Sequence, residues 1–145
     1  MNIWFVSPYL ITIFIAWFGS HTIKYFINSS KHKKVSLVST YFKSGGMPSS
    51  HSATVASLTM IIGLRDGFGS AIFGLTLLFA LIVIYDSFKL RRSSGEQGLA
   101  IRSLIKEQNS SVKLPMVTEG HSFKEVLFGI AFGVIIGAVV FLSTV

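Results

Sequence analysis

Two histidines in this sequence stand where backbone and side-chain groups suit the binding of an anion. His51 lies in the stretch GGMPSSHSA and His121 in EGHSFKEV, and each stretch has glycine before an apolar segment. A helix that begins at Ser49 has N–H groups in its first turn without partners in the helix, and such a terminus binds anions. The hydroxyls of Ser49, Ser50 and Ser52 add possible donors. The alternative is that Ser49 only caps the helix.

The elements that must position these histidines are helices in a membrane. Half of the residues are hydrophobic, only 13% are charged and the mean hydropathy is +0.63, whereas a soluble domain carries about 25% charged residues. Each apolar stretch is near the roughly 20 residues that a helix needs to cross a bilayer. The second stretch is short, so we expect it to be the most buried or the most tilted. The four stretches are about Ile3–Ile27, Ser49–Leu64, Ser70–Leu90 and Ser122–Val145.

These stretches predict an all-α fold: one integral-membrane domain over residues 1–145, a polytopic bundle of about four transmembrane helices. The first stretch has no basic region before it and no small-residue cleavage site, so we expect a retained helix rather than a signal peptide. Between the third and fourth stretches, apolar residues recur at roughly helical spacing among charged ones, which predicts one amphipathic helix at the membrane surface. These residues are Leu99, Ile101, Leu104 and Ile105.

The placement of charge predicts the orientation. Arg65 stands apart from the other basic residues, which the order of spans puts on one side of the membrane. The positive-inside rule makes that side cytoplasmic, so we expect a multi-pass protein of the cell membrane with His51 and His121 at the same depth on its cytoplasmic side. The alternative is that these charges serve only topology and attraction to anionic lipid. His21, one turn before Lys24, is interpreted as a polar residue at the interface. The basic residues on the shared side are Lys24, Lys31, Lys33, Lys34, Lys43, Lys89, Arg91, Arg92, Arg102, Lys106, Lys113 and Lys124.

A small residue recurs every four positions in the last apolar stretch, at Gly129, Gly133 and Gly137. Such a stripe lets a second helix approach closely in a membrane. It indicates either tight packing within the protein or a homodimer seam.

Several classes of function are excluded or disfavoured. The chain has no cysteine, which excludes disulfides, thiol nucleophiles and zinc–thiolate sites. The carboxylates are scattered and form no cluster with metal-ligand spacing, so we expect no metal and no cofactor. Although the isoelectric point is 9.9, the basic residues lie at helix ends and are not interleaved with aromatic residues, so we expect no binding of nucleic acid.

Three ordered motifs carry a resemblance to a known family. GGMPSSHSA and GHSFKEVLFG resemble the second and third motifs of the type-2 phosphatidic acid phosphatases, a superfamily that includes the vanadium haloperoxidases. With YDSFKLRRSSGEQ between them, the chain resembles the divergent bacterial and plastid branch of that superfamily from about Lys24 to Gly137. This resemblance implies a membrane phosphatase.

The resemblance also implies roles for single residues. His121 is the nucleophile that forms a phosphohistidine, Glu125 orients it and His51 protonates the leaving oxygen as general acid. The spacing agrees with this, since residues i and i+4 share one face of a helix. The residues implied to hold phosphate are Lys24, Ser49, Ser50, Arg91 and Arg92, with Asp86 as the ion-pair partner that positions the arginines.

The chain departs from the superfamily pattern in its charges. Pro115 stands six residues before His121, where the superfamily has an arginine, and Glu125 and Ser50 replace the usual aspartate and glycine. Phosphoryl transfer needs positive charge around the equatorial oxygens, so other cations must supply it. The alternative is that the charged residues at these helix ends are simple interface residues.

We therefore expect a metal-independent phosphatase that hydrolyses a phosphomonoester or pyrophosphate lipid at the cytoplasmic face. Its expected partners are the membrane and a phosphorylated membrane lipid, with a homodimer through the glycine stripe as an open alternative. The alternative function is a non-catalytic membrane protein that binds phosphorylated lipid or a protein partner, and loss of the usual arginine would be its signature.

Overall fold

The fold is built from helices throughout the part of the chain that the computed structural model describes, which is residues 7–31, 46–117 and 120–145. The prediction of an all-α membrane bundle is confirmed. The basic residues Lys33, Lys34 and Lys43 lie outside the described residues. The elements are α1 (Pro8–Lys31), α3 (Ser50–Asp66), α4 (Ala71–Tyr85), a π-helical turn η1 (Asp86–Leu90), α5 (Arg91–Glu107) and α6 (Phe123–Thr144).

Local sequence signals explain where these helices begin. Pro8 opens α1, where the missing N–H costs no hydrogen bond. Serine hydroxyls cap the next helices, because Ser49, Ser70 and Ser122 each accept a hydrogen bond from the backbone N–H three residues on. Gly67 ends α3 with a φ of 91°, which favours glycine.

Three helical stretches are long and apolar enough to cross a membrane: Pro8–Ser30, Ala71–Glu107 and Phe123–Thr144. With 17 residues, α3 is about 25 Å long, which is less than the roughly 30 Å of a hydrocarbon core. It is the short second stretch of the sequence, and it buries more residues than any other described helix. The expectation that this stretch is the most buried one is therefore confirmed.

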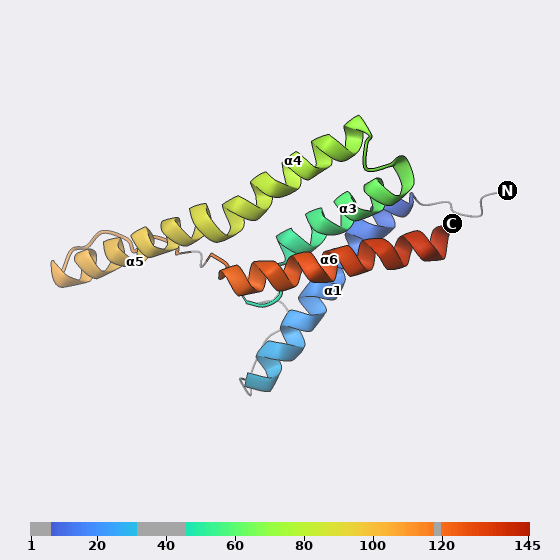
Figure 1. The fold of residues 1–145 in the computed structure, drawn as a ribbon. Coiled ribbons are helices and arrows are strands. Elements are labelled where there is room, and N and C mark those ends of the chain that lie inside the picture. The colour runs from blue at the N-terminus through green and yellow to red at the C-terminus, as the bar shows by residue number, and fades with distance from the viewer. Residues whose placement is uncertain (1–6, 32–45, 118–119) are drawn as a thin grey trace.

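The centre of the bundle is α3, which packs against α1, α4 and α6 (Figure 1). The glycine stripe of α6 makes its contact with α3 close. A Cβ atom on any of the three stripe glycines would lie within 3.0 Å of a backbone oxygen of α3. The stripe is thus used for packing within one chain, and a homodimer seam through the same glycines would require α3 to leave. The glycines Gly129, Gly133 and Gly137 face the carbonyls of Ser49, Ala53 and Ser57 in that order.

The helices α4 and α5 form one continuous helix through η1, visible as the long rod in Figure 1. Its 37 residues span about 55 Å, well beyond the thickness of a bilayer core. The expected amphipathic helix is α5, and Leu99, Ile101 and Leu104 on it are exposed. Its continuity with α4 was not anticipated from the sequence, and its position at the membrane surface stays a prediction.

Candidate functional site

The candidate site lies where α1, the start of α3, the turn η1 and the start of α6 meet at one end of the bundle. Two backbone hydrogen bonds join these segments. The N–H of Ser49 donates to the carbonyl of Glu125 at 3.0 Å, and the N–H of His121 donates to the carbonyl of Ser87 at 3.1 Å. These contacts bring the two histidine motifs together although they are far apart in sequence.

His121 is buried, with 4% of its surface exposed, and its ring is held by Glu125. The imidazole Nδ1 lies 3.2 Å from Oε2 of the Glu125 carboxylate. A carboxylate accepts hydrogen bonds, so Nδ1 carries the proton and the lone pair of a neutral ring lies on Nε2. This is the tautomer that leaves a nucleophilic nitrogen on the far side of the ring.

The carboxylate of Glu125 is itself fixed by the start of α6. Glu125 is the third residue of the helix, and its Oε2 accepts the N–H of Ser122 at 3.0 Å while the Ser122 hydroxyl accepts the N–H of Glu125. This reciprocal pair is a capping box, which requires a side chain long enough to reach back to the N-cap. The capping box gives a physical reason for glutamate where the superfamily has aspartate.

The protonation of His121 depends on its burial and on its neighbours. Burial holds the pKa of His121 below its ordinary value of 6.5, because desolvation disfavours the imidazolium. The Glu125 carboxylate opposes this and raises the pKa, whereas the positive charges of Lys24 and Arg91 lower it further. The net direction is down, so the ring stays neutral to lower pH than a free histidine does.

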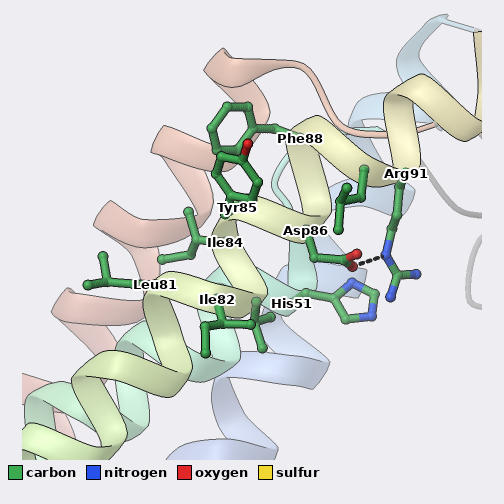
Figure 2. Close-up of a pocket in the computed structure, with 10 residues that line it drawn as sticks. His51, Leu81, Ile82, Ile84, Tyr85, Asp86, Phe88 and Arg91 are labelled. Atoms are coloured by element: carbon green, nitrogen blue, oxygen red, sulfur yellow. Dashed lines mark hydrogen bonds and ion pairs between the residues drawn. The ribbon is translucent and has the colours of Figure 1, made fainter.

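His51 lies in the first turn of α3 and is exposed to a cavity of about 770 Å³ (Figure 2). Asp86 and Arg91 share the polar end of this cavity with His51, and His121, Lys24 and His21 are close enough to act on its charge. The remaining wall is apolar and comes from α4 and η1. It consists of Leu81, Ile82, Val83, Ile84, Tyr85, Phe88 and Leu90.

The two neighbouring arginines face different surroundings. The Nε of Arg91 donates to Oδ2 of Asp86 at 2.7 Å, and this pair faces His51 in Figure 2. The Nε of Arg92 donates instead to Glu96 at 3.1 Å, on the exposed surface of α5. Arg92 lines a second, smaller cavity, which includes Glu125 but neither histidine. The structure therefore places Arg91, and not Arg92, in the cavity with His51.

Lys24 is buried, with 3% of its surface exposed, although it lies on a membrane-spanning helix. Its aliphatic stem lies against Gly46, where a Cβ would be 3.5 Å from the lysine Cγ and Cδ atoms. Its ammonium acts electrostatically on Glu125, His121 and His51. Lys24 is thus a second cation in the cluster.

The serines of the second motif are buried at the start of α3, where Ser49 is the N-cap. Ser49 is fully buried, and its hydroxyl accepts hydrogen bonds from the N–H of Ser52 at 3.4 Å and from the Ser52 hydroxyl at 3.0 Å. This is the N-cap role that the sequence left open as an alternative. Both of these bonds use the Ser49 oxygen as acceptor, so its O–H donor is not used by the cap. Ser50, also buried, begins α3, so its N–H precedes the intrahelical bonds.

Sequence reasoning did not identify three further contributors. The carbonyl of Ser87 anchors the backbone of His121. Gly120 packs against α5, since a Cβ there would overlap the backbone of Arg92. His21 was placed at the interface, yet it is buried, with its Nδ1 donating to the carbonyl of Trp17 at 2.9 Å. The contacts of Ser87 and Gly120 join distant segments and have no signal in the local sequence.

Comparison with known proteins identifies the family of this chain. A family model described as the Divergent PAP2 family matches residues 5–136. The Uncharacterized membrane protein YuiD of Bacillus subtilis (strain 168) is 35% identical over 107 residues, which are 63% of this chain and 68% of that protein. No solved structure matches the chain. The match over most of the sequence confirms the resemblance and the membrane location, and the chain belongs to the Divergent PAP2 family.

Proposed function

We propose that this protein is a lipid phosphate phosphatase that works through a phosphohistidine on His121. One arrangement carries the proposal: the hydrogen-bonded His121–Glu125 pair lies near His51, and His51 lines the polar end of a cavity whose other walls are apolar. A phosphate group fits the polar end by charge. The apolar walls on α4 suit a hydrocarbon chain attached to that phosphate.

In the first step, Nε2 of His121 attacks phosphorus and the bond from phosphorus to the lipid oxygen breaks. His51, as imidazolium, gives its proton to that leaving oxygen. In the second step, water attacks phosphorus, its proton passes to His51, and the P–N bond breaks to free His121 and inorganic phosphate. Glu125 keeps its hydrogen bond to Nδ1 throughout and stabilises the imidazolium character that develops on His121.

Lys24 and Arg91 supply the positive charge that phosphoryl transfer requires. Both act electrostatically on His51 and His121, so a phosphoryl group between the histidines lies within their field. Asp86 holds Arg91 toward the cavity through its ion pair. Together these two cations take over the part of the superfamily arginine that Pro115 replaces.

The placement of basic residues supports a site on the cytoplasmic side of the cell membrane, in a multi-pass protein. Arg65 lies at the opposite end of the bundle, where it donates to the carbonyl of Thr144 at 3.1 Å. A cytoplasmic site favours lipid phosphates made on the inner leaflet.

One observation favours a second candidate function, a non-catalytic protein that binds phosphorylated lipid. Pro115 does not carry a cation, and its carbonyl accepts a hydrogen bond from Arg102 at 2.9 Å, which ties this segment to α5. The usual place of the superfamily arginine is therefore occupied by a structural contact. A protein that kept the cluster but lost turnover would still bind phosphate there.

The two candidates are separated by assaying the detergent-purified protein against phosphatidic acid, phosphatidylglycerol phosphate, isoprenyl phosphates and water-soluble glycerol phosphate, with and without chelator. We expect release of phosphate from a lipid, unaffected by chelator, and inhibition by vanadate, which mimics the five-coordinate transfer geometry. Vanadate binding without hydrolysis would favour the binding protein. A folded protein with neither property would contradict both candidates.

A further inference from the structure

The turn η1 interrupts the regular pattern of a 37-residue helix at the point nearest the histidine cluster. Its residues, Asp86–Leu90, include neither proline nor glycine, so no residue type in the turn forces the irregularity. A π turn closes hydrogen bonds between residues five apart and frequently marks a functional site. Here the N–H of Arg91 donates to the carbonyl of Asp86.

The wide turn brings Asp86 and Arg91 onto one face. In a regular α-helix, residues five apart differ by about 140° around the axis, so their side chains diverge. Across η1 the same two residues form the 2.7 Å ion pair that faces His51. The following residue, Arg92, points to the exposed surface of α5 instead.

The same turn also holds the backbone of the nucleophile. In the described structure the Ser87 carbonyl accepts the N–H of His121, whereas in an α-helix it would accept an N–H four residues on. The hydroxyl of Ser87 donates to the carbonyl of Ile84 at 2.8 Å, so the buried side chain satisfies a neighbouring carbonyl. Gly120 packs against the start of α5, directly after the turn, where a Cβ would overlap the backbone nitrogen of Arg92.

We propose that η1 is the positioning element of the site and that Ser87 and Gly120 are positioning residues. This proposal rests on the phosphatase function proposed above, because the positioning role matters only if His121 reacts with phosphate. One turn sets both the direction of the Arg91 cation and the place of His121. The distance between cation and nucleophile is therefore fixed by a single element rather than by two independent helices.

Deletion of Lys89 tests this inference. Lys89 is exposed and lines neither the cavity with His51 nor the smaller cavity beside Arg92. Removing one residue shortens the wide turn to an α-helical one. Asp86 and Arg91 become four apart and keep a shared face, whereas the Ser87 carbonyl returns to the helical ladder and releases His121. The matched control is Lys89→Ala, which removes the same charge and keeps the turn.

We expect the deletion to lower kcat about 100-fold, the cost of misplacing a reacting group by about 1 Å. KM for the lipid should stay within threefold, since Lys24 and Arg91 remain. Vanadate affinity should fall together with kcat, because vanadate mimics a transfer geometry that includes the displaced His121. Lys89→Ala should stay near wild type in all three. Gly120→Ala places a Cβ against the backbone of Arg92, directly after η1, and so pushes the His121 segment away from the turn; it should give the same split between kcat and KM.

A second measurement uses the unmodified protein. Residue-resolved hydrogen–deuterium exchange should show the His121 amide protected, because it donates to Ser87. Rapid exchange at this amide would overturn the inference, and so would deletion and Gly120→Ala variants that keep wild-type kcat. Absence of hydrolysis in wild type together with a protected amide would instead contradict the phosphatase function and leave the docking on η1 intact.

Discussion

Replacing each of the two adjacent arginines by alanine should have very different effects. Arg91 faces His51 at the polar end of the cavity, whereas Arg92 forms an exposed pair with Glu96, whose side chains are 60% and 66% exposed. Loss of a donor that stabilises transition-state charge costs roughly 10²-fold, or about 2.7 kcal/mol. Loss of an exposed i,i+4 ion pair lowers stability by less than about 0.5 kcal/mol. It does not remove any contact that the proposed mechanism makes with the substrate.

The assay is kcat/KM for the best lipid phosphate in mixed micelles. We expect kcat/KM to fall about 100-fold in Arg91→Ala and to stay within about twofold of wild type in Arg92→Ala. Arg91→Lys should recover only part of the loss, because an ammonium keeps the charge but not the planar fork of donors. The kcat/KM of Asp86→Asn should lie between those of wild type and Arg91→Ala, since this change weakens the ion pair of Arg91 without removing the arginine.

Equal losses in the two alanine variants would refute the assignment of Arg91 to the site. So would a larger loss in Arg92→Ala, which would mean that the cavity beside Arg92 receives the phosphate. If both variants stayed within a few-fold of wild type, Lys24 would be the main remaining cation.

Three further predictions follow from burial, packing and charge placement. Attack needs neutral His121, so activity should fall as pH drops through its lowered pKa, with the acid limb below pH 6.5, and it should fall again as pH rises and His51 loses the proton that it donates. Glu125→Gln should move the acid limb to lower pH and Lys24→Met should move it to higher pH, and shifts of the same sign would contradict the account. Gly133→Ala should destabilise the bundle by about 1–3 kcal/mol in thermal unfolding, whereas Gly74→Ala, with open space around it, should be neutral or stabilising; equal unfolding temperatures would speak against the close α3–α6 contact. Single cysteines at Lys113 and at Gly69 should be labelled from the cytoplasmic side and the outside respectively, and the reverse pattern would invert the proposed orientation.

The positions of the helices could be read from the sequence because their determinants are local. Apolar length marks the spans, and serines at Ser49, Ser70 and Ser122 mark where three helices begin. The His121–Glu125 contact is local too, since it joins residues four apart in sequence, although His121 lies just before the N-cap of α6 rather than on the helix.

The parts that could not be predicted depend on contacts between distant segments. Two adjacent arginines look equivalent in a sequence, and only the register set by η1 separates Arg91 from Arg92. Lys24 becomes a buried cation only because α1 packs beside Gly46 and the start of α3. The sequence allows the hydroxyl of Ser49 to face a ligand or to cap the helix, and the structure shows it fully buried as the N-cap of α3.

The most direct test of the central claim is to trap the phosphorylated enzyme. Purified protein is mixed with a lipid labelled in its phosphate, quenched in alkali and digested, because phosphohistidine survives alkali and is lost in acid. We predict label on His121, no label in His121→Ala, and slow labelling in His51→Ala when the leaving group is good enough to need little protonation. Label on another residue, or full turnover by His121→Ala, would contradict the proposed mechanism.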